Sequence, residues 1–157
     1  MKKIVILIST ILSGIVLDQI SKILVDRLMG LGQTIPIIKN FLHLTYIRNR
    51  GAAFGMLSNH RWVFMVISTV AIIGIAIYLF GFCKERMLFK VGLALIVSGG
   101  IGNMIDRILY GYVIDMIDFR VINFAVFNVA DSFVCIGAGL VILCLVLDLA
   151  KASKKDN

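Results

Sequence analysis

Residues 62–83 read WVFMVISTVAIIGIAIYLFGFC, an apolar stretch that contains no charged side chain. Three other apolar stretches of similar length occupy about 4–25, 88–108 and 128–149. A helix needs about 20 apolar residues to cross a bilayer, and lipid satisfies no backbone polar group. Each stretch is therefore predicted to be a transmembrane helix. A β-barrel is excluded, because no stretch alternates with a period of two.

The composition also indicates an integral membrane protein. Of the 157 residues, 60% are hydrophobic and 16% are charged, whereas soluble domains average about 45–50% apolar and about 25% charged. We therefore predict an all-α membrane protein with four transmembrane helices, built as a single integral membrane domain over 1–157. A secretory signal peptide is an alternative for the first stretch, but no small-residue cleavage site follows it.

Charge and cysteine content narrow the functional classes. The net charge is +7, but many of the basic residues flank apolar runs, as topology anchors do, and no nucleic-acid recognition motif accompanies them. Cys83, Cys135 and Cys144 are odd in number and form no CxxC motif, so we interpret them as buried small hydrophobic residues. Neither histidine has a second ligand at metal-binding spacing. We expect no nucleic-acid partner, no metal and no cofactor.

The distribution of Lys and Arg predicts the orientation of the helices. Dense basic segments precede the first apolar stretch, separate the second from the third, and follow the fourth. They contain Lys2 and Lys3; Lys84, Arg86 and Lys90; and Lys151, Lys154 and Lys155. By the positive-inside rule, this side and both termini are predicted to be cytoplasmic.

The first outer connection, about 26–61, is long for a link between helices. Within it, residues 41–48 (FLHLTYIR) are rich in aromatic and β-branched types and roughly alternate. This pattern predicts a small β-element on the membrane surface, bounded by Gly32 and Pro36, within a β-like segment over about 33–61. Residues 54–60 are predicted to form a short interfacial helix.

Several ionisable residues lie toward the predicted outer ends of the helices, where they form one layer. They are Asp18, Lys22, Asp106, Arg107, Asp115 and Asp131. Each ionisable residue at membrane depth costs roughly 2.5–3.5 kcal/mol, so a shared level indicates a site. An ion pair that only anchors a helix end is the alternative for Asp18 and Lys22, which stand four residues apart.

The third stretch carries polar residues late in its run. Gly99, Gly100, Asn103, Asp106 and Arg107 are predicted to share one side of this helix, with the glycines allowing close packing. Snorkelling of the charged side chains to the membrane interface is the alternative to a functional role.

Two carboxylates come from the segments that end the third stretch and begin the fourth. Asp131 fits a capping box with Asn128. Asp115 lies in an apolar segment (YVIDMI, 112–117) with no nearby Lys or Arg, which predicts a partner from elsewhere; an ordinary loop acid beside Asp118 is the alternative. Two adjacent carboxylates share a proton, and such a pair can activate water for peptide hydrolysis without a metal.

Two other functional classes stay open on these residues alone. One is a small transporter or channel with acidic residues near its outer mouth, which would need polar groups across the whole membrane. The other is a non-enzymatic assembly protein that uses glycine faces for helix contacts.

Five sequence blocks occur in order along the four apolar stretches. They are DQISK at 18–22, NRGAAF at 49–54, GNMIDR at 102–107, VID at 113–115 and FNVADS at 127–132. In these blocks the chain resembles the bacterial lipoprotein signal peptidases (signal peptidase II), a family of aspartic membrane proteases.

The resemblance implies specific roles for residues of these blocks. The catalytic dyad would be Asp115 and Asp131. Supporting or substrate-binding roles are implied for Asp18, Lys22, Asn49, Gly51, Asn103, Asp106, Arg107 and Asn128. We expect Asp131, near a helix N-terminus, to be the more acidic member of the dyad, with Asp115 holding the shared proton. Met116 departs from the family, which often has Phe there, and only a local packing change is expected.

The resemblance also implies a substrate and a location. The substrate would be a prolipoprotein whose cysteine already carries a thioether-linked diacylglyceryl group, cleaved just before that cysteine. Membrane lipid would be the other partner. The enzyme would be a multi-pass protein of the bacterial cytoplasmic membrane with its active site toward the outer face.

Overall fold

The structure is a computed structural model that describes residues 1–51, 61–122 and 124–153. Its long helices are α1 (Lys2–Leu28), α2 (Arg61–Ile77), α3 (Met87–Leu109) and α4 (Val129–Ser153), and a π-helical turn, η2 (Tyr78–Phe82), continues α2. Four helical segments within these residues are long and apolar enough to cross a membrane, which confirms the predicted class. The apolar stretches form helices because every backbone polar group in lipid needs a hydrogen-bond partner within the protein.

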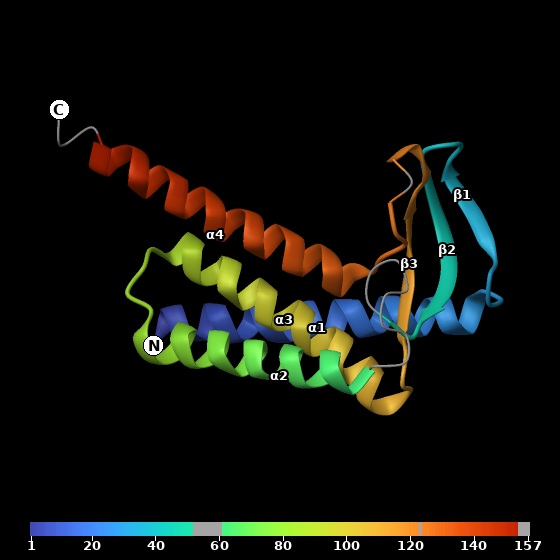
Figure 1. Cartoon of the computed structure of the whole chain (residues 1–157), viewed down its shortest axis with the longest axis horizontal. Helices are drawn as coiled ribbons and strands as arrows, with labels where there is room; N and C mark the ends of the chain where they lie inside the picture. The colour runs from blue at the N-terminus through green and yellow to red at the C-terminus, as the bar shows by residue number, and fades with distance from the viewer. Residues whose placement is uncertain (52–60, 123, 154–157) are drawn as a thin grey trace.

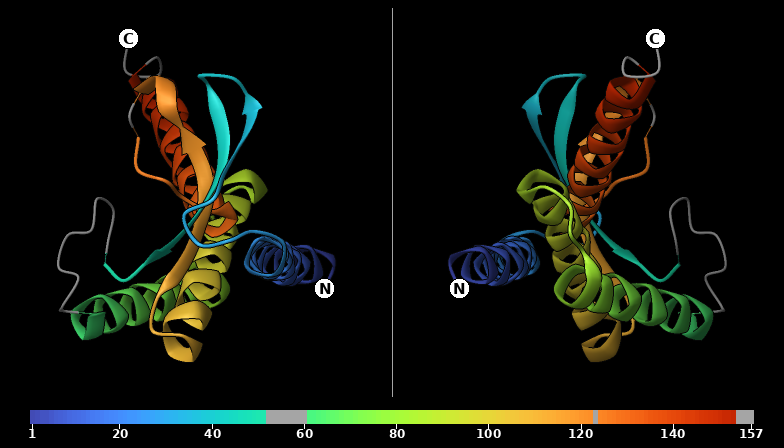
Figure 2. Two further views of the ribbon diagram at one scale, coloured as in Figure 1. Left: turned by 90° about the vertical axis from the view of Figure 1, so that its right-hand side faces the viewer. Right: turned by 90° about the vertical axis from the view of Figure 1, so that its left-hand side faces the viewer.

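Helix α3 lies in the middle of the bundle and contacts each of the other three helices (Figure 2). More than half of its apolar window is buried inside the protein, whereas the windows of the other helices are mostly exposed. The N-terminus and the C-terminal end of α4 lie at the end of the bundle opposite the sheet (Figure 1). The central position of α3 means that its different sides face different neighbours.

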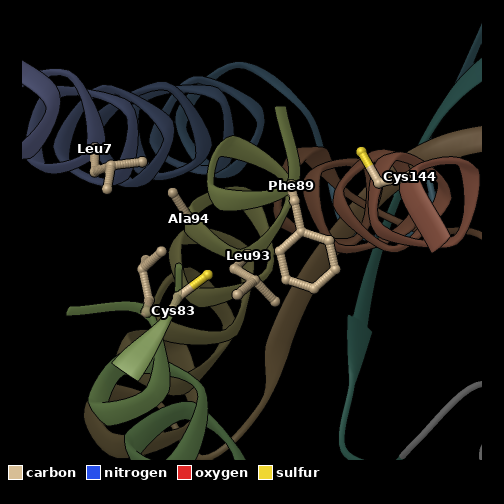
Figure 3. Close-up of a cluster of buried hydrophobic side chains, with 7 residues drawn as sticks. Leu7, Cys83, Phe89, Leu93, Ala94 and Cys144 are labelled. Carbon is tan, nitrogen blue, oxygen red and sulfur yellow. The ribbon is translucent and has the colours of Figure 1, made fainter. Parts of the chain in front are cut away.

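A cluster of buried hydrophobic side chains joins the helices near the end that carries the termini (Figure 3). Its members are Leu7, Leu79, Cys83, Phe89, Leu93, Ala94 and Cys144. The prediction of buried cysteines is correct for Cys83 and Cys144 but wrong for Cys135, which is exposed. Cys135 lines a cavity, where its side chain stays accessible.

Two glycines of α3 allow the close approach of neighbouring helices. A Cβ on Gly99 would collide with the Ala130 carbonyl of α4, and one on Gly102 would lie 2.6 Å from Asp18 Oδ2 of α1. Gly100, in contrast, packs against Ile72 of α2. The prediction that these glycines share one side of α3 with its polar residues is therefore wrong for Gly100, which points about 100° away from Gly99.

The sheet at one end of the bundle has three antiparallel strands in the order β1 (Thr34–Ile38), β2 (Leu42–Asn49) and β3 (Val113–Phe119). The predicted β-element exists, but β3 comes from the connection between α3 and α4, where no strand was expected; a short 3-10 helix, η3 (Arg120–Ile122), follows it. Pro36 lies within β1 and does not bound the element, since an edge strand tolerates proline. The predicted interfacial helix at 54–60 lies outside the described residues.

Strand β3 presents its two faces to different parts of the molecule. Asp115 is paired in register with Ile47 of β2, and side chains alternate along a strand. Ile114 and Met116 consequently lie on the opposite face, where they pack with Tyr46 and the end of α1 at Val25. This packing fixes β3 so that the Asp115 side chain points away from Ile114, Met116 and the apolar residues that pack with them.

Candidate active site

A cavity of about 300 Å³ lies between the ends of α3 and α4 and the sheet. Its lining residues are Asn49, Asn103, Arg107, Val113, Asp115, Phe124, Ala125, Val126, Phe127, Asp131, Ser132 and Cys135. The two predicted catalytic aspartates both line it, Asp115 from β3 and Asp131 from the first turn of α4. The apolar wall of residues 124–127 could not be found from sequence, because apolar residues are unremarkable in such a chain.

Asp115 is held by two asparagine amides. Its carboxyl is only 2% exposed and accepts hydrogen bonds from Asn49 Nδ2 at 3.0 Å and Asn128 Nδ2 at 2.7 Å. Its partners thus come from elsewhere in the chain, as expected for an acid in an apolar segment. Burial raises the pKa of Asp115 to about 6; the charge of Asp131 acts in the same direction, while both amide bonds oppose it.

Asp131 takes part in the predicted capping box and also faces the cavity. The Asp131 N–H donates to Asn128 Oδ1 at 2.9 Å, and the Asn128 N–H donates to Asp131 Oδ2 at 3.3 Å. The other carboxylate oxygen accepts from Asn103 Nδ2 at 2.7 Å. Capping and a site role are therefore compatible, because they use different oxygens of one carboxylate.

Two asparagines connect the aspartates to each other. Asn128 Nδ2 donates to Asp115 Oδ1 and also to Asn103 Oδ1 at 3.0 Å, so both of its amide hydrogens are used. The Oδ1 of Asn103 also accepts a hydrogen bond from Lys22. The Nδ2 of Asn103 therefore faces Asp131, to which it donates. Asn49 is fixed in the same way, since its Oδ1 accepts the N–H of the buried Gly51 at 2.9 Å.

A buried ion cluster lies behind these asparagines. Lys22 Nζ lies 2.9 Å from Asp18 and 2.9 Å from Asp106, and no side chain of the three is more than 2% exposed. The predicted pair of Asp18 and Lys22 exists but is not self-contained, because Asp106 and Asn103 also bind the lysine. Gln19, which sequence reasoning missed, donates to both carboxylates. Its only signal was a polar amide beside Asp18 in an apolar run.

Arg107 points into the cavity and does not simply reach the membrane interface. Its guanidinium donates to the Asn103 carbonyl at 3.2 Å, and the side chain is half-buried. It shares the cavity with Asp115 and Asp131, so it supplies positive charge beside the two carboxylates. In the described part of the chain no three His, Cys, Asp or Glu side chains are grouped as metal ligands, and we assign none.

The chain matches known proteins over most of its length. Residues 10–147 match the family model described as signal peptidase (SPase) II. The lipoprotein signal peptidase of Streptococcus agalactiae serotype V is 46% identical over 100% of this chain and 99% of its own length. That of Halalkalibacterium halodurans is 44% identical over 91% and 93%.

Solved structures agree with the sequence matches. A bacterial membrane enzyme solved at 2.3 Å resolution has a TM-score of 0.87 and 32% identity, with 92% of this chain and 90% of the other covered. A second, solved at 1.9 Å, has a TM-score of 0.81 and 33% identity, with 88% and 91% covered. With a family model that spans most of the chain, relatives at about 45% identity and this fold, the chain belongs to the signal peptidase II family of membrane aspartic proteases.

Proposed function

We propose that the protein removes signal peptides from diacylglyceryl-modified prolipoproteins, cleaving just before the lipidated cysteine. The observation that carries the proposal is the meeting of Asp115 and Asp131 in one cavity, joined by Asn128, which hydrogen-bonds both. The related proteins are lipoprotein signal peptidases, which supports this substrate class.

In the proposed reaction one proton is shared by the dyad. Asp131, ionised, takes a proton from the attacking water, whose oxygen bonds to the scissile carbonyl carbon, while Asp115 gives its proton to the carbonyl oxygen. The carbon–nitrogen bond then breaks as Asp131 gives the proton from water to the leaving amine, while Asp115 takes a proton back from a hydroxyl of the tetrahedral intermediate. No covalent intermediate forms. The elevated pKa of Asp115, about 6, supports its assignment as the proton donor.

The surrounding residues divide into those that hold the dyad and those that can meet the substrate. Both amide hydrogens of Asn128 are used in hydrogen bonds within the network, so we propose that Asn128 positions the aspartates and does not bind substrate. Arg107 lines the cavity and is the candidate to polarise the substrate carbonyl. The apolar wall at 124–127 suits the side chains next to the scissile bond and the lipid.

We also propose that the cavity opens toward the outer face of the cytoplasmic membrane. The start of α1, the link between α2 and α3 and the last turns of α4 lie at one end of the bundle and carry the described dense basic residues, whereas the sheet lies at the other end (Figure 1). The cavity is lined by Asp115 of β3 and by the first turn of α4, and so belongs to the sheet end. The acyl chains of a lipidated cysteine keep that residue at the membrane surface. An outward cavity would thus receive the scissile bond at the level of the dyad.

A transporter or channel is not supported. The relatives are lipoprotein signal peptidases. In addition, the polar network is confined to the sheet end, while buried apolar side chains fill the other end of the described bundle. A path for cations would need polar groups along its whole length.

Cleavage of matched substrates by the purified protein tests the proposal. A prolipoprotein with the diacylglyceryl group and the same prolipoprotein without it are incubated with the protein, and the products are identified by mass spectrometry. We expect a released signal peptide and a new N-terminal cysteine from the lipidated substrate alone. Equal cleavage of both substrates, or a cut at another bond, would contradict the proposed specificity.

A further inference from the structure

We infer that the buried cluster of Asp18, Lys22 and Asp106 is a positioning device that sets the geometry of the catalytic dyad. This inference rests on the proposed function. The inference adds to the proposed function by assigning to each member of the cluster the group near the dyad that it binds. None of the three residues lines the cavity itself, so their effect must pass through the residues that they bind.

The two carboxylates of the cluster each hold the backbone next to one dyad aspartate. Asp18 Oδ1 accepts the N–H of Ala130 at 2.9 Å, and Ala130 directly precedes Asp131. Asp106 Oδ2 accepts the N–H of Ile114 at 3.2 Å, and Ile114 directly precedes Asp115. The ends of β3 and α4 that carry the dyad are thereby tied to α1 and α3.

Lys22 joins these two attachments into one unit. Its ammonium group bridges Asp18 and Asp106, so that the two carboxylates keep a fixed separation. Its third contact, at 3.0 Å, goes to Asn103 Oδ1. Since an ammonium group only donates, this contact fixes which end of the Asn103 amide faces Asp131. Gln19 completes the unit by donating to both carboxylates.

Stability alone does not explain such a cluster. Burying two carboxylates and an ammonium group carries a desolvation penalty that can exceed their attraction, and well-packed apolar side chains often serve stability equally well. The same charges do provide strong, directional hydrogen bonds to two backbone amides. Misplacement of reacting groups by about 1 Å can cost about 10²-fold in rate, so a rigid anchor for each aspartate has a catalytic consequence.

The test compares kcat and KM of Asp18→Asn and Asp106→Asn with those of the wild-type protein, corrected for the folded fraction. We expect kcat to fall about 10²-fold and KM to stay within about threefold, because the dyad moves while the substrate cavity remains. Gln19→Met, which removes two donors without changing charge, should lower kcat about tenfold. If the Asp18 and Asp106 variants do not fold, the kcat of Gln19→Met alone tests the positioning role of the cluster.

Asp148→Asn is the matched control. Asp148 pairs with Arg86 at the end of α4 far from the cavity and is exposed, so its loss should leave kcat unchanged. Unchanged kcat per folded molecule in the cluster variants and Gln19→Met, or a rise in KM alone, would overturn the inference. Normal turnover by Asp115→Asn would instead overturn the proposed function, which separates the two failures.

Discussion

Asp115 and Asp131 carry the same carboxyl group, but the surroundings of the two side chains differ. Asp115 is buried on a strand, where loss of water favours its neutral form and raises its pKa to about 6. Asp131 is only half-buried and lies in the first turn of α4, where its carboxylate accepts hydrogen bonds from the Asn128 N–H and from Asn103 Nδ2. This asymmetry divides the roles of acid and base between two identical side chains.

The pH dependence of cleavage follows from this asymmetry. We predict that kcat/KM falls as pH rises through about 6, roughly tenfold per unit, because the reaction needs a proton on Asp115. The corresponding fall in kcat should lie at higher pH, since bound substrate excludes more water from the carboxyl. Initial rates at constant ionic strength measure the pH dependence of both kcat/KM and kcat. A kcat/KM that is flat from about pH 5 to about pH 8 would contradict the assignment.

Stability should change over the same pH range and in the same direction. The folded pKa of Asp115 lies above its ordinary value of 3.8, so folding favours the protonated form. Its contribution is therefore complete below about pH 3.8 and is lost as pH rises through about 6. The Asp115→Asn variant, which cannot ionise, should lose less stability across this range than the wild-type protein in thermal unfolding. An identical loss in both would contradict burial as the cause of the shift.

Met116 shows that neighbours of the dyad can serve packing alone. It is 3% exposed and packs with Met29 and Tyr46 on the face of β3 opposite Asp115. We predict that Met116→Ala destabilises the protein by about 2–5 kcal/mol, while Met116→Leu costs less than about 1.5 kcal/mol. Both should keep kcat per folded molecule, measured after thermal unfolding curves are matched. A selective loss of kcat in Met116→Leu would show that this residue acts on the dyad.

At the scale of elements, the helices could be predicted and β3 could not. The length of an apolar run decides whether a helix spans a bilayer, and this signal is local. Strand β3 is stabilised by pairing with β2, more than sixty residues earlier in the chain, and Val113–Phe119 lacks the alternation of a half-exposed strand. The resemblance gave the site residues, but the bonds from Asp18 to the Ala130 N–H and from Asp106 to the Ile114 N–H use backbone donors that no residue type reveals.

The contact between α3 and α4 positions the first turn of α4, which carries Asp131. We predict that Gly99→Ala costs about 1–3 kcal/mol and lowers kcat, because the added Cβ must push the Ala130 carbonyl away. Gly139→Ala is the matched control on α4. Nothing lies within 4 Å of its added Cβ, so it should be neutral or slightly stabilising. Equal effects of the two substitutions on thermal unfolding and turnover would contradict this account of the interface.

At the scale of the whole molecule, the interior of the described bundle differs between its two ends, with buried polar groups at one and buried apolar side chains at the other. The sheet lies at one end of the bundle, and the start of α1 and the last turns of α4 lie at the other (Figure 1). The ion cluster and the cavity belong to the sheet end, and the buried apolar cluster with Leu7 and Cys144 belongs to the opposite end. A helix bundle so divided can place one reaction at one membrane surface. The orientation of that surface is what the positive-inside rule predicts.

Thiol labelling in intact cells tests this orientation. In a Cys135→Ser background, Lys39→Cys beside the turn between β1 and β2 should react with a membrane-impermeant reagent, because Lys39 is exposed at the sheet end. Lys151→Cys, exposed near the C-terminus, should react only after the cells are made permeable. The opposite pattern would place the cavity on the cytoplasmic side and contradict the proposed topology.

Release of signal peptide by folded single-residue variants tests the dyad most directly. Asp118→Asn serves as the control, because Asp118 lies on the same strand as Asp115 but bonds Thr45 and Arg120 away from the cavity. We predict that Asp115→Asn and Asp131→Asn each lose at least about 10³-fold in kcat, while Asp118→Asn stays within about twofold of the wild-type protein. Near-normal turnover by either folded dyad variant would contradict peptide hydrolysis by a shared-proton pair of aspartates.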